Sequence, residues 1–177
     1  MAIIDNLLNI TPFNWIEILS ALIAGGIIGI ERQLSGKPIG IRTSILICIS
    51  TYIFATFCSL NPQGIPNPAY IIGQIITGIG FLGAGVILTR DGIVLGVTSA
   101  ACIWILAAIG ITIGLNYPYT GVKLALLAVI LLTGIDKLEK HIPFLHKGPY
   151  KKQNTDKKNL QQRTAPDCFS AALQSGR

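Results

Sequence analysis

The chain has 177 residues, of which 51% are hydrophobic and 12% charged, and it carries a formal net charge of +6. Soluble domains of this length carry about twice that share of charged residues. The composition therefore excludes a soluble globular protein, and the mean hydropathy of +0.60 predicts an integral membrane protein.

Five apolar stretches are long enough to cross a bilayer as helices, which takes about 20 residues each. In chain order they cover residues 13–33, 41–60, 69–89, 93–115 and 119–137. They lack the alternation of polar and apolar residues that barrel strands show. The sequence therefore predicts an all-α integral membrane protein. Residues 1–142 form a compact bundle of about five transmembrane helices, and residues 143–177 form a short, basic, disordered tail.

The distribution of basic residues orients the predicted bundle. The connection between the first two stretches carries Arg32, Lys37 and Arg42 against one acidic residue, Glu31, whereas the later connections at 61–68 and 115–119 carry no charge. Since basic loops remain on the cytoplasmic side, we expect the N-terminus outside and the lysine-rich C-terminus in the cytoplasm. The tail then anchors the chain against anionic membrane lipid, and no motif indicates binding to nucleic acid.

The sequence contains no motif of a known enzyme class. Three cysteines fall in predicted helices and one in the tail, and no CxxC pair, catalytic triad or Walker loop occurs. We therefore expect a protein that is not an enzyme and has no cofactor. A metal site stays undetermined, with Mg²⁺ as the candidate ion.

Charged residues gather at the helix ends that are predicted to face the cytoplasm: Glu31, Arg32, Arg42, Arg90 and Asp91. Ionisable groups so close to hydrocarbon are unfavourable unless they are paired or hydrated. One interpretation is structural, with a carboxylate and a guanidinium pairing to join two helix ends. The other is functional, with the cluster binding an ion, a phosphate-bearing ligand or a partner helix. Mg²⁺ prefers carboxylate oxygens and water, and the basic neighbour of each carboxylate disfavours a direct magnesium site.

The stretch TGIGFLGAGVI at 77–87 holds four glycines, each of which weakens an ordinary helix by roughly 1 kcal/mol relative to alanine. On a helical wheel, bulky residues such as Ile75 and Ile79 share one side, which we expect to face lipid. Small residues share the other side, which we expect to face protein, because small residues let membrane helices approach closely. The predicted packing or partner face comprises Gly25 and Gly29 on the first helix and Gly73, Thr77, Gly80, Gly83, Ala84 and Gly85 on the third. A central place in the bundle, self-association, and contact with another membrane protein all fit this face.

Four segments occur in a fixed order: GGIIGIERQ at 25–33, GIRTSIL at 40–46, TGIGFLGAGVIL at 77–88 and GVTSAACIWILAAIGITIG at 96–114. Over about residues 10–140 the chain thereby resembles the membrane domain of the MgtC/SapB family of bacterial proteins. The positions that match the family motifs are Gly29, Glu31, Arg32, Gly40, Arg42, Thr43, Gly80, Phe81, Gly83, Gly85, Thr98, Ala100, Trp104 and Gly110.

The resemblance implies a multi-pass protein of the bacterial inner (plasma) membrane, with an association with magnesium and virulence. It implies a non-catalytic regulator of another membrane complex, such as the F-type ATP synthase, in adaptation to low magnesium or in survival inside host cells. Transport of Mg²⁺ or another small ion is the alternative. The best-known members continue into a folded cytoplasmic domain, whereas residues 143–177 are too few and too polar to build a core. The resemblance therefore does not imply, for this chain, any function that depends on such a cytoplasmic domain.

Overall fold

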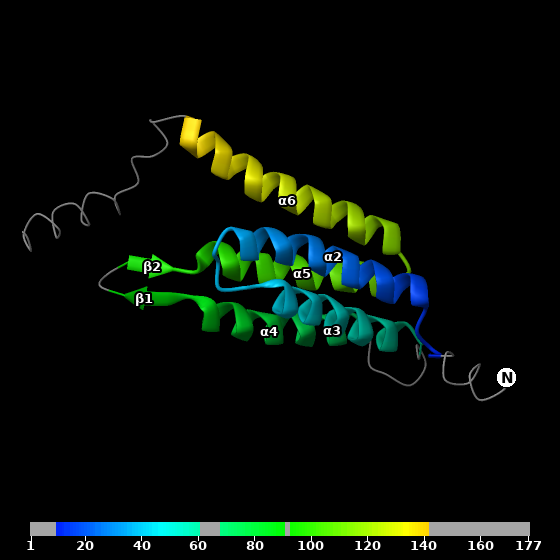
Figure 1. Ribbon diagram of the computed structural model, residues 1–177. Coiled ribbons are helices and arrows are strands. Elements are labelled where there is room, and N and C mark those ends of the chain that lie inside the picture. The colour runs from blue at the N-terminus through cyan, green and yellow to red at the C-terminus, as the bar shows by residue number, and fades with distance from the viewer. Residues whose placement is uncertain (1–9, 61–67, 91–92, 142–177) are drawn as a thin grey trace, which may run out of the picture. The chain divides into compact units, whose positions relative to one another are not determined.

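The computed structural model describes residues 10–60, 68–90 and 93–141 (Figure 1). In chain order its elements are α2 (Trp15–Leu34), α3 (Ile41–Leu60), α4 (Pro68–Val86), β1 (Leu88–Arg90), β2 (Ile93–Leu95), α5 (Val97–Gly114) and α6 (Pro118–His141). The predicted helical bundle is confirmed, and four of these helices, α3 to α6, are long and apolar enough to cross a membrane. The described residues up to Gly134 belong to one compact unit, and Ile135–His141 continue α6 in a second. The predicted tail at 143–177 lies outside the described residues.

The buried face of α2 follows a heptad spacing. Steps of four and three residues separate its buried members: Glu17, Ala21, Ala24, Ile28 and Glu31. Such steps place side chains on one side of a helix, and α2 contacts α3 and α5. The two carboxylates therefore belong to the same buried stripe as the apolar residues between them.

Glycines bring the backbones of α2, α3 and α5 into close contact. A Cβ atom on Gly29 of α2 would lie 2.6 Å from the Cα atom of Ile41 on α3. A Cβ atom on Gly110 of α5 would overlap the hydroxyl of Thr51 on α3. Because no side chain fits in these gaps, glycine is what allows the helices to approach so closely. α3 contacts both neighbours in this way and forms the centre of the unit.

Residues 88–90 and 93–95 form two short strands where the sequence predicted the end of one helix and the start of the next. α4 ends at Val86 rather than at 89, and α5 begins at Val97 rather than at 93. β1 and β2 pair antiparallel, with Leu88 opposite Leu95. The Asp-Gly sequence at 91–92, flanked by runs with β-branched residues, is typical of a hairpin. Apolar runs alone do not separate a short strand from a helix, which is why the boundaries were wrong.

The side of α4 that faces the other helices differs in part from the prediction, because Gly83 of the small side is buried as expected but bulky residues are buried too. Ile79 is 7% exposed, and Ile75 and Val86 pack against the core, whereas the sequence interpretation placed these bulky side chains toward lipid. Thr77 and Ala84, from the small side, are exposed instead. A helical wheel separates a bulky side from a small side, but lipid tails are as apolar as leucine. The pattern therefore does not determine which side faces inward.

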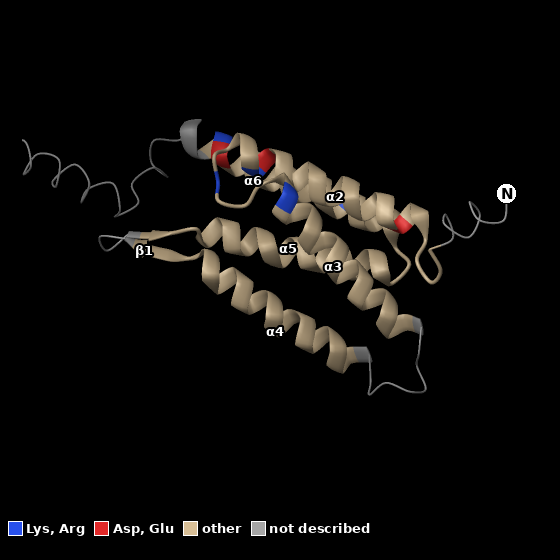
Figure 2. Cartoon of the chain, turned by 60° about the horizontal axis from the view of Figure 1, so that its bottom comes forward, with Lys and Arg blue, Asp and Glu red and all other residues tan. Residues whose placement is uncertain are grey.

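The first part of α6 packs on α5 through small residues. Ala125 and Ala128 are buried, and a Cβ atom on Gly121 would overlap the side chain of Ile113. Figure 2 shows that charged residues lie on α2, the loop after it, the start of α3 and α6, whereas α4 and α5 carry none. Charged groups that meet the helical core therefore come chiefly from α2.

Candidate functional site at the end of helix α2

The last turn of α2 is a Schellman motif, which fixes Lys37 close to the backbone of Arg32. Gly36 has a φ of 63°, a left-handed conformation that glycine adopts without strain. Its N–H donates to the carbonyl of Gln33 at 3.1 Å, and the N–H of Lys37 donates to the carbonyl of Arg32 at 3.0 Å. The amide oxygen of Gln33 accepts from the N–H of Ile41 at 3.3 Å, which connects this turn to the start of α3.

Glu31 and Arg32 form a buried ion pair at this end of α2. Arg32 is 1% exposed and Glu31 is 7% exposed, and Arg32 Nη1 lies 3.7 Å from Glu31 Oε2. Arg32 Nη2 donates to Oγ of Ser99 on α5 at 3.4 Å, and Glu31 Oε1 accepts from the hydroxyl of Ser35 at 2.9 Å. The guanidinium therefore connects α2 to a residue 67 positions away in the sequence.

Hydrogen bonding in this cluster is incomplete. Within the described part of the chain, Arg32 Nε, Glu31 Oε2 and Ser44 Oγ are buried and have no hydrogen-bond partner. A guanidinium offers five N–H donors, and the bond from Arg32 to Ser99 is long. Most buried polar atoms in folded proteins are satisfied, so the cluster has unused capacity for a polar ligand.

The other charged residues of the predicted cluster have different surroundings. Arg42 is exposed in the first turn of α3. Arg90 ends β1, and its side chain and the whole of Asp91 lie outside what the structure describes. Glu31 pairs with its sequence neighbour Arg32. The structural interpretation of the sequence had instead expected it to pair with a guanidinium at the end of another helix. Ligand binding by the cluster stays a prediction.

The predicted packing or partner face divides between two environments. Gly25 and Gly29 lie against the backbone of α3. Gly80 and Gly83 lie beside Trp104 of α5, where added Cβ atoms would be 3.9 Å and 3.6 Å from the nearest indole atoms. The remaining members are exposed: Gly73, Thr77, Ala84 and Gly85.

Small residues form a stripe along the outer side of α4, here named the α4 stripe: Gly73, Thr77, Gly80 and Ala84. Their steps of four and three residues place them on one side of the helix. A Cβ atom on Gly73 would meet no atom within 4 Å, and the Thr77 hydroxyl donates to the carbonyl of Gly73 at 3.0 Å. In the apolar window of α4 11% of residues are buried, against 56% in α5. The described chain therefore leaves Gly73, Thr77 and Ala84 of the α4 stripe exposed, whereas Gly80 lies beside Trp104 of α5.

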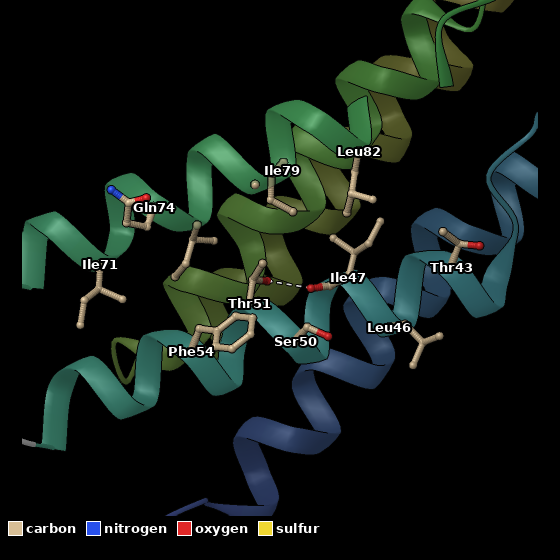
Figure 3. A pocket seen from close by; sticks show the side chains of 12 residues that line it. Thr43, Leu46, Ile47, Ser50, Thr51, Phe54, Ile71, Gln74, Ile79 and Leu82 are labelled. Carbon is tan, nitrogen blue, oxygen red and sulfur yellow. Dashed lines mark hydrogen bonds between the residues drawn. The ribbon is translucent and has the colours of Figure 1, made fainter. Parts of the chain in front are cut away.

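An open groove separates α4 from α3 (Figure 3). Its cavity of about 680 Å³ is lined mainly by apolar side chains, such as Phe54 from α3 and Leu82 from α4, and Gln74 adds an amide. Figure 3 also shows the hydrogen bond of 2.9 Å that the Thr51 hydroxyl donates to the carbonyl of Ile47 within α3. α4 thus makes its main contact with α5 rather than with α3.

Sequence reasoning did not identify the interaction of Glu17 at the other end of α2. Tyr52 Oη donates to Glu17 Oε2 at 3.1 Å and accepts from the backbone N–H of Asn14 at 3.4 Å. A signal existed, because Glu17 and Glu31 are two heptads apart and therefore lie on the same side of α2. The contacts of Tyr52 and Ser99 left no such signal, since they join positions that are distant in the sequence.

The fold and these sites define a small helical membrane protein whose helices pack through glycines and whose ion pair is buried at one end of α2. A sequence model of the MgtC family matches residues 18–141. Because this match covers more than half of the 177 residues, the chain belongs to the MgtC family.

Three curated relatives illustrate the match. "Putative magnesium transporter YhiD" of Escherichia coli (strain K12) is 41% identical over 125 residues, which cover 66% of this chain and 58% of the relative. Protein MgtC of Brucella abortus (strain 2308) is 40% identical over 94 residues, covering 53% and 39% respectively. Protein SapB of Bacillus subtilis (strain 168) is 36% identical over 106 residues, covering 55% and 45%. The chain thus spans about half the length of the curated relatives it matches, and no solved structure matches it.

Proposed function

We propose that this protein is a non-catalytic regulator in the bacterial inner membrane that binds a transmembrane helix of another membrane complex through the α4 stripe. The F-type ATP synthase is the example of such a complex that the family resemblance supplies, with low magnesium or survival in host cells as the setting. The observation that carries the proposal is the exposure of Gly73, Thr77 and Ala84 on α4.

Helix energetics support a protein partner for this surface. A glycine inside a helix destabilises that helix by roughly 0.5–1 kcal/mol relative to alanine. Contact with lipid does not offset this loss. Gly73 lies in open space in the described chain, so no intramolecular contact offsets its presence. Small residues at such steps favour close approach of a second helix. A partner helix seated along the α4 stripe accounts for these residues.

The test is cross-linking and co-purification of the full chain from native membranes under magnesium limitation. Gly73→Leu and Ala84→Leu each place a bulky side chain where a partner helix would lie. At position 73 no atom of the chain lies within 4 Å of the added Cβ, so the new side chain does not clash within the protein there. The matched control is Gly134→Leu on α6, because Gly134 is also exposed with no atom within 4 Å of an added Cβ.

We expect the two α4 variants to lose the co-purified membrane protein while Gly134→Leu retains it, with equal amounts of all three proteins in the membrane. Equal recovery of the partner with all three variants contradicts the proposal. Loss of a cross-link between two copies of the chain, with no other protein captured, also contradicts it and assigns the α4 stripe to self-association.

Transport of Mg²⁺ or another small ion is the second candidate, and the name of the YhiD relative favours it. Glu31 and Glu17 provide buried carboxylates near the two ends of α2. Within the residues described, no group of three or more His, Cys, Asp or Glu side chains could hold a metal ion. An ion path would therefore rely on single carboxylates and on neutral oxygens.

Purified protein in liposomes distinguishes this candidate from the first. Flux of Mg²⁺ into the liposomes that falls in Glu31→Gln and persists in Gly73→Leu supports transport. Liposomes that stay impermeable to Mg²⁺ with correctly folded protein contradict transport and leave the regulator proposal untouched.

A further inference from the structure

A small cavity lies between the end of α2 and the start of α5. Its volume is about 260 Å³, and both basic and neutral polar groups line it. Arg32 lines it from α2, and Lys37 and Pro38 line it from the following loop. On the other side it is lined by Leu95 at the end of β2 and by Gly96, Thr98 and Ser99 at the start of α5. The lining includes two cationic side chains and no carboxylate.

The N-terminus of α5 opens at this cavity. Gly96 is the N-cap residue, with a φ of 88°, and no side chain caps the helix there. A Cβ atom on Gly96 would overlap the carbonyl of Val86, so this position excludes the serine, threonine or aspartate side chains that usually cap a helix. The first N–H groups of a helix lack intrahelical acceptors and carry a partial positive charge. An 18-residue helix such as α5 therefore attracts an anion at this end.

Arg32 is a second and independent indication of a ligand. Its side chain lines the cavity and is 2% exposed, and its Nε has no hydrogen-bond partner in the described structure. Glu31 lies 3.7 Å from Nη1, which is longer than the roughly 2.7–2.9 Å of a charge-assisted hydrogen bond. Glu31 also accepts from Ser35 and is absent from the lining of the cavity. The guanidinium is therefore only partly neutralised, and Lys37 adds a second positive charge.

We propose that this cavity binds a phosphate group, held by Arg32, Lys37 and the N-terminal N–H groups of α5. A planar guanidinium with several donors matches the oxygens of a phosphate, and a helix N-terminus adds backbone donors. The cavity is smaller than the roughly 300–1,000 Å³ of sites for drug-sized ligands. It accommodates a single phosphate rather than a nucleotide. The phosphate comes either from a lipid headgroup or from solution.

The basic character of this end of the molecule agrees with both sources. Lys37 is exposed in the loop between α2 and α3, on the side that the sequence predicts to face the cytoplasm. Anionic lipid headgroups and free phosphate both reach that side. The site shares no residue with the α4 stripe. Phosphate binding can therefore be tested independently of the proposed regulator function.

The test compares the full chain with Lys37→Gln and with the matched control Lys123→Gln. Lys37 is exposed, so its replacement leaves the buried Glu31–Arg32 pair in place, and Lys123 is an exposed lysine on α6 that does not line the cavity. One arm titrates inorganic phosphate at constant ionic strength into detergent-purified protein and measures the dissociation constant. The other arm measures, by native mass spectrometry, the retention of phosphatidylglycerol from nanodiscs that contain phosphatidylglycerol and phosphatidylcholine.

We expect Lys37→Gln to weaken binding in one of the two arms by about tenfold, the loss that follows when one charge-assisted hydrogen bond is removed. Lys123→Gln should match the unmodified protein. A response in the phosphate arm identifies free phosphate as the ligand, and a response in the lipid arm alone identifies the headgroup.

As a second variant, Thr98→Val removes a hydroxyl from the cavity lining with little change of shape. We expect it to weaken binding in the same arm. The proposal is overturned if neither ligand binds, or if Lys37→Gln and Thr98→Val both bind as tightly as Lys123→Gln.

Discussion

The two glutamates of α2 have unequal hydrogen bonding. Glu17 accepts from Tyr52 at 3.1 Å, across the contact between α2 and α3. Glu31 accepts from Ser35, the C-cap residue of its own helix, and its second oxygen has a guanidinium 3.7 Å away but no hydrogen bond in the described structure. Because buried charged groups are stabilised mainly by good hydrogen bonds, Glu17 is a structural anchor and Glu31 belongs to a site with unused capacity.

The Tyr52→Phe variant tests the anchoring role of Glu17. Removal of the hydroxyl leaves Glu17 Oε2 buried without its donor, and an unsatisfied buried polar group destabilises a protein by about 1–3 kcal/mol. We expect the free energy of unfolding in mild detergent to fall by that amount. The matched control is Tyr119→Phe on α6, where the tyrosine is 72% exposed and the change should be within about 0.5 kcal/mol. Equal stability of the two variants would show that Glu17 does not depend on Tyr52.

Glycines have opposite effects on two of the helices, because some lie in helix contacts and others lie on an uncovered surface. On α5, Gly110 lies against Thr51 and the backbone of α3, so its missing side chain allows two helices to pack. On α4, Gly73 has no neighbour within 4 Å of an added Cβ. The same residue type therefore stabilises one helix contact and weakens an uncovered helix.

Alanine substitutions should separate these purposes by the sign of their effect. Gly110→Ala forces α5 away from α3, and overpacking of this kind destabilises a protein by about 1–3 kcal/mol. Gly73→Ala removes a poor helix former in open space, so we expect it to stabilise α4 by roughly 0.5–1 kcal/mol. Chemical denaturation of the purified variants measures both changes. A loss of stability in Gly73→Ala would indicate a neighbour within the chain that the described residues do not show.

The helices themselves were predictable from the sequence, because an apolar run of about 20 residues has few alternatives in a membrane. The strands at 88–90 and 93–95 were not, since their leucines, isoleucine and valine extend the apolar runs on both sides. The direction in which Ile79 points was not predictable either, because a bilayer accepts bulky and small side chains alike. Within the site, the charges of Glu31 and Arg32 were visible, whereas the partner of Arg32, Ser99, depends on tertiary packing.

The arrangement of the whole molecule in the bilayer is a prediction that labelling can check. Lys37 and Tyr117 are exposed in the links before α3 and before α6. With the N-terminus outside, the positive-inside rule places Lys37 in the cytoplasm and Tyr117 outside. In a background without other cysteines, a membrane-impermeant maleimide should label Tyr117→Cys in intact cells and label Lys37→Cys only after the cells are opened. The reverse pattern would invert the orientation.

The heptad stripe of α2 has a consequence for how the protein is made. Charged residues within a helix oppose its partition from the translocon into lipid, by up to about 2.5–3.5 kcal/mol each at the centre and less near the ends. α2 carries Glu17, Glu31 and Arg32, and it is the described helix that is not among the four candidate membrane spans. Tyr52 on α3 and Ser99 on α5 supply its interhelical hydrogen bonds. We therefore expect α2 to wait at the translocon until α3 has been synthesised, so that the two helices enter the bilayer as a pair.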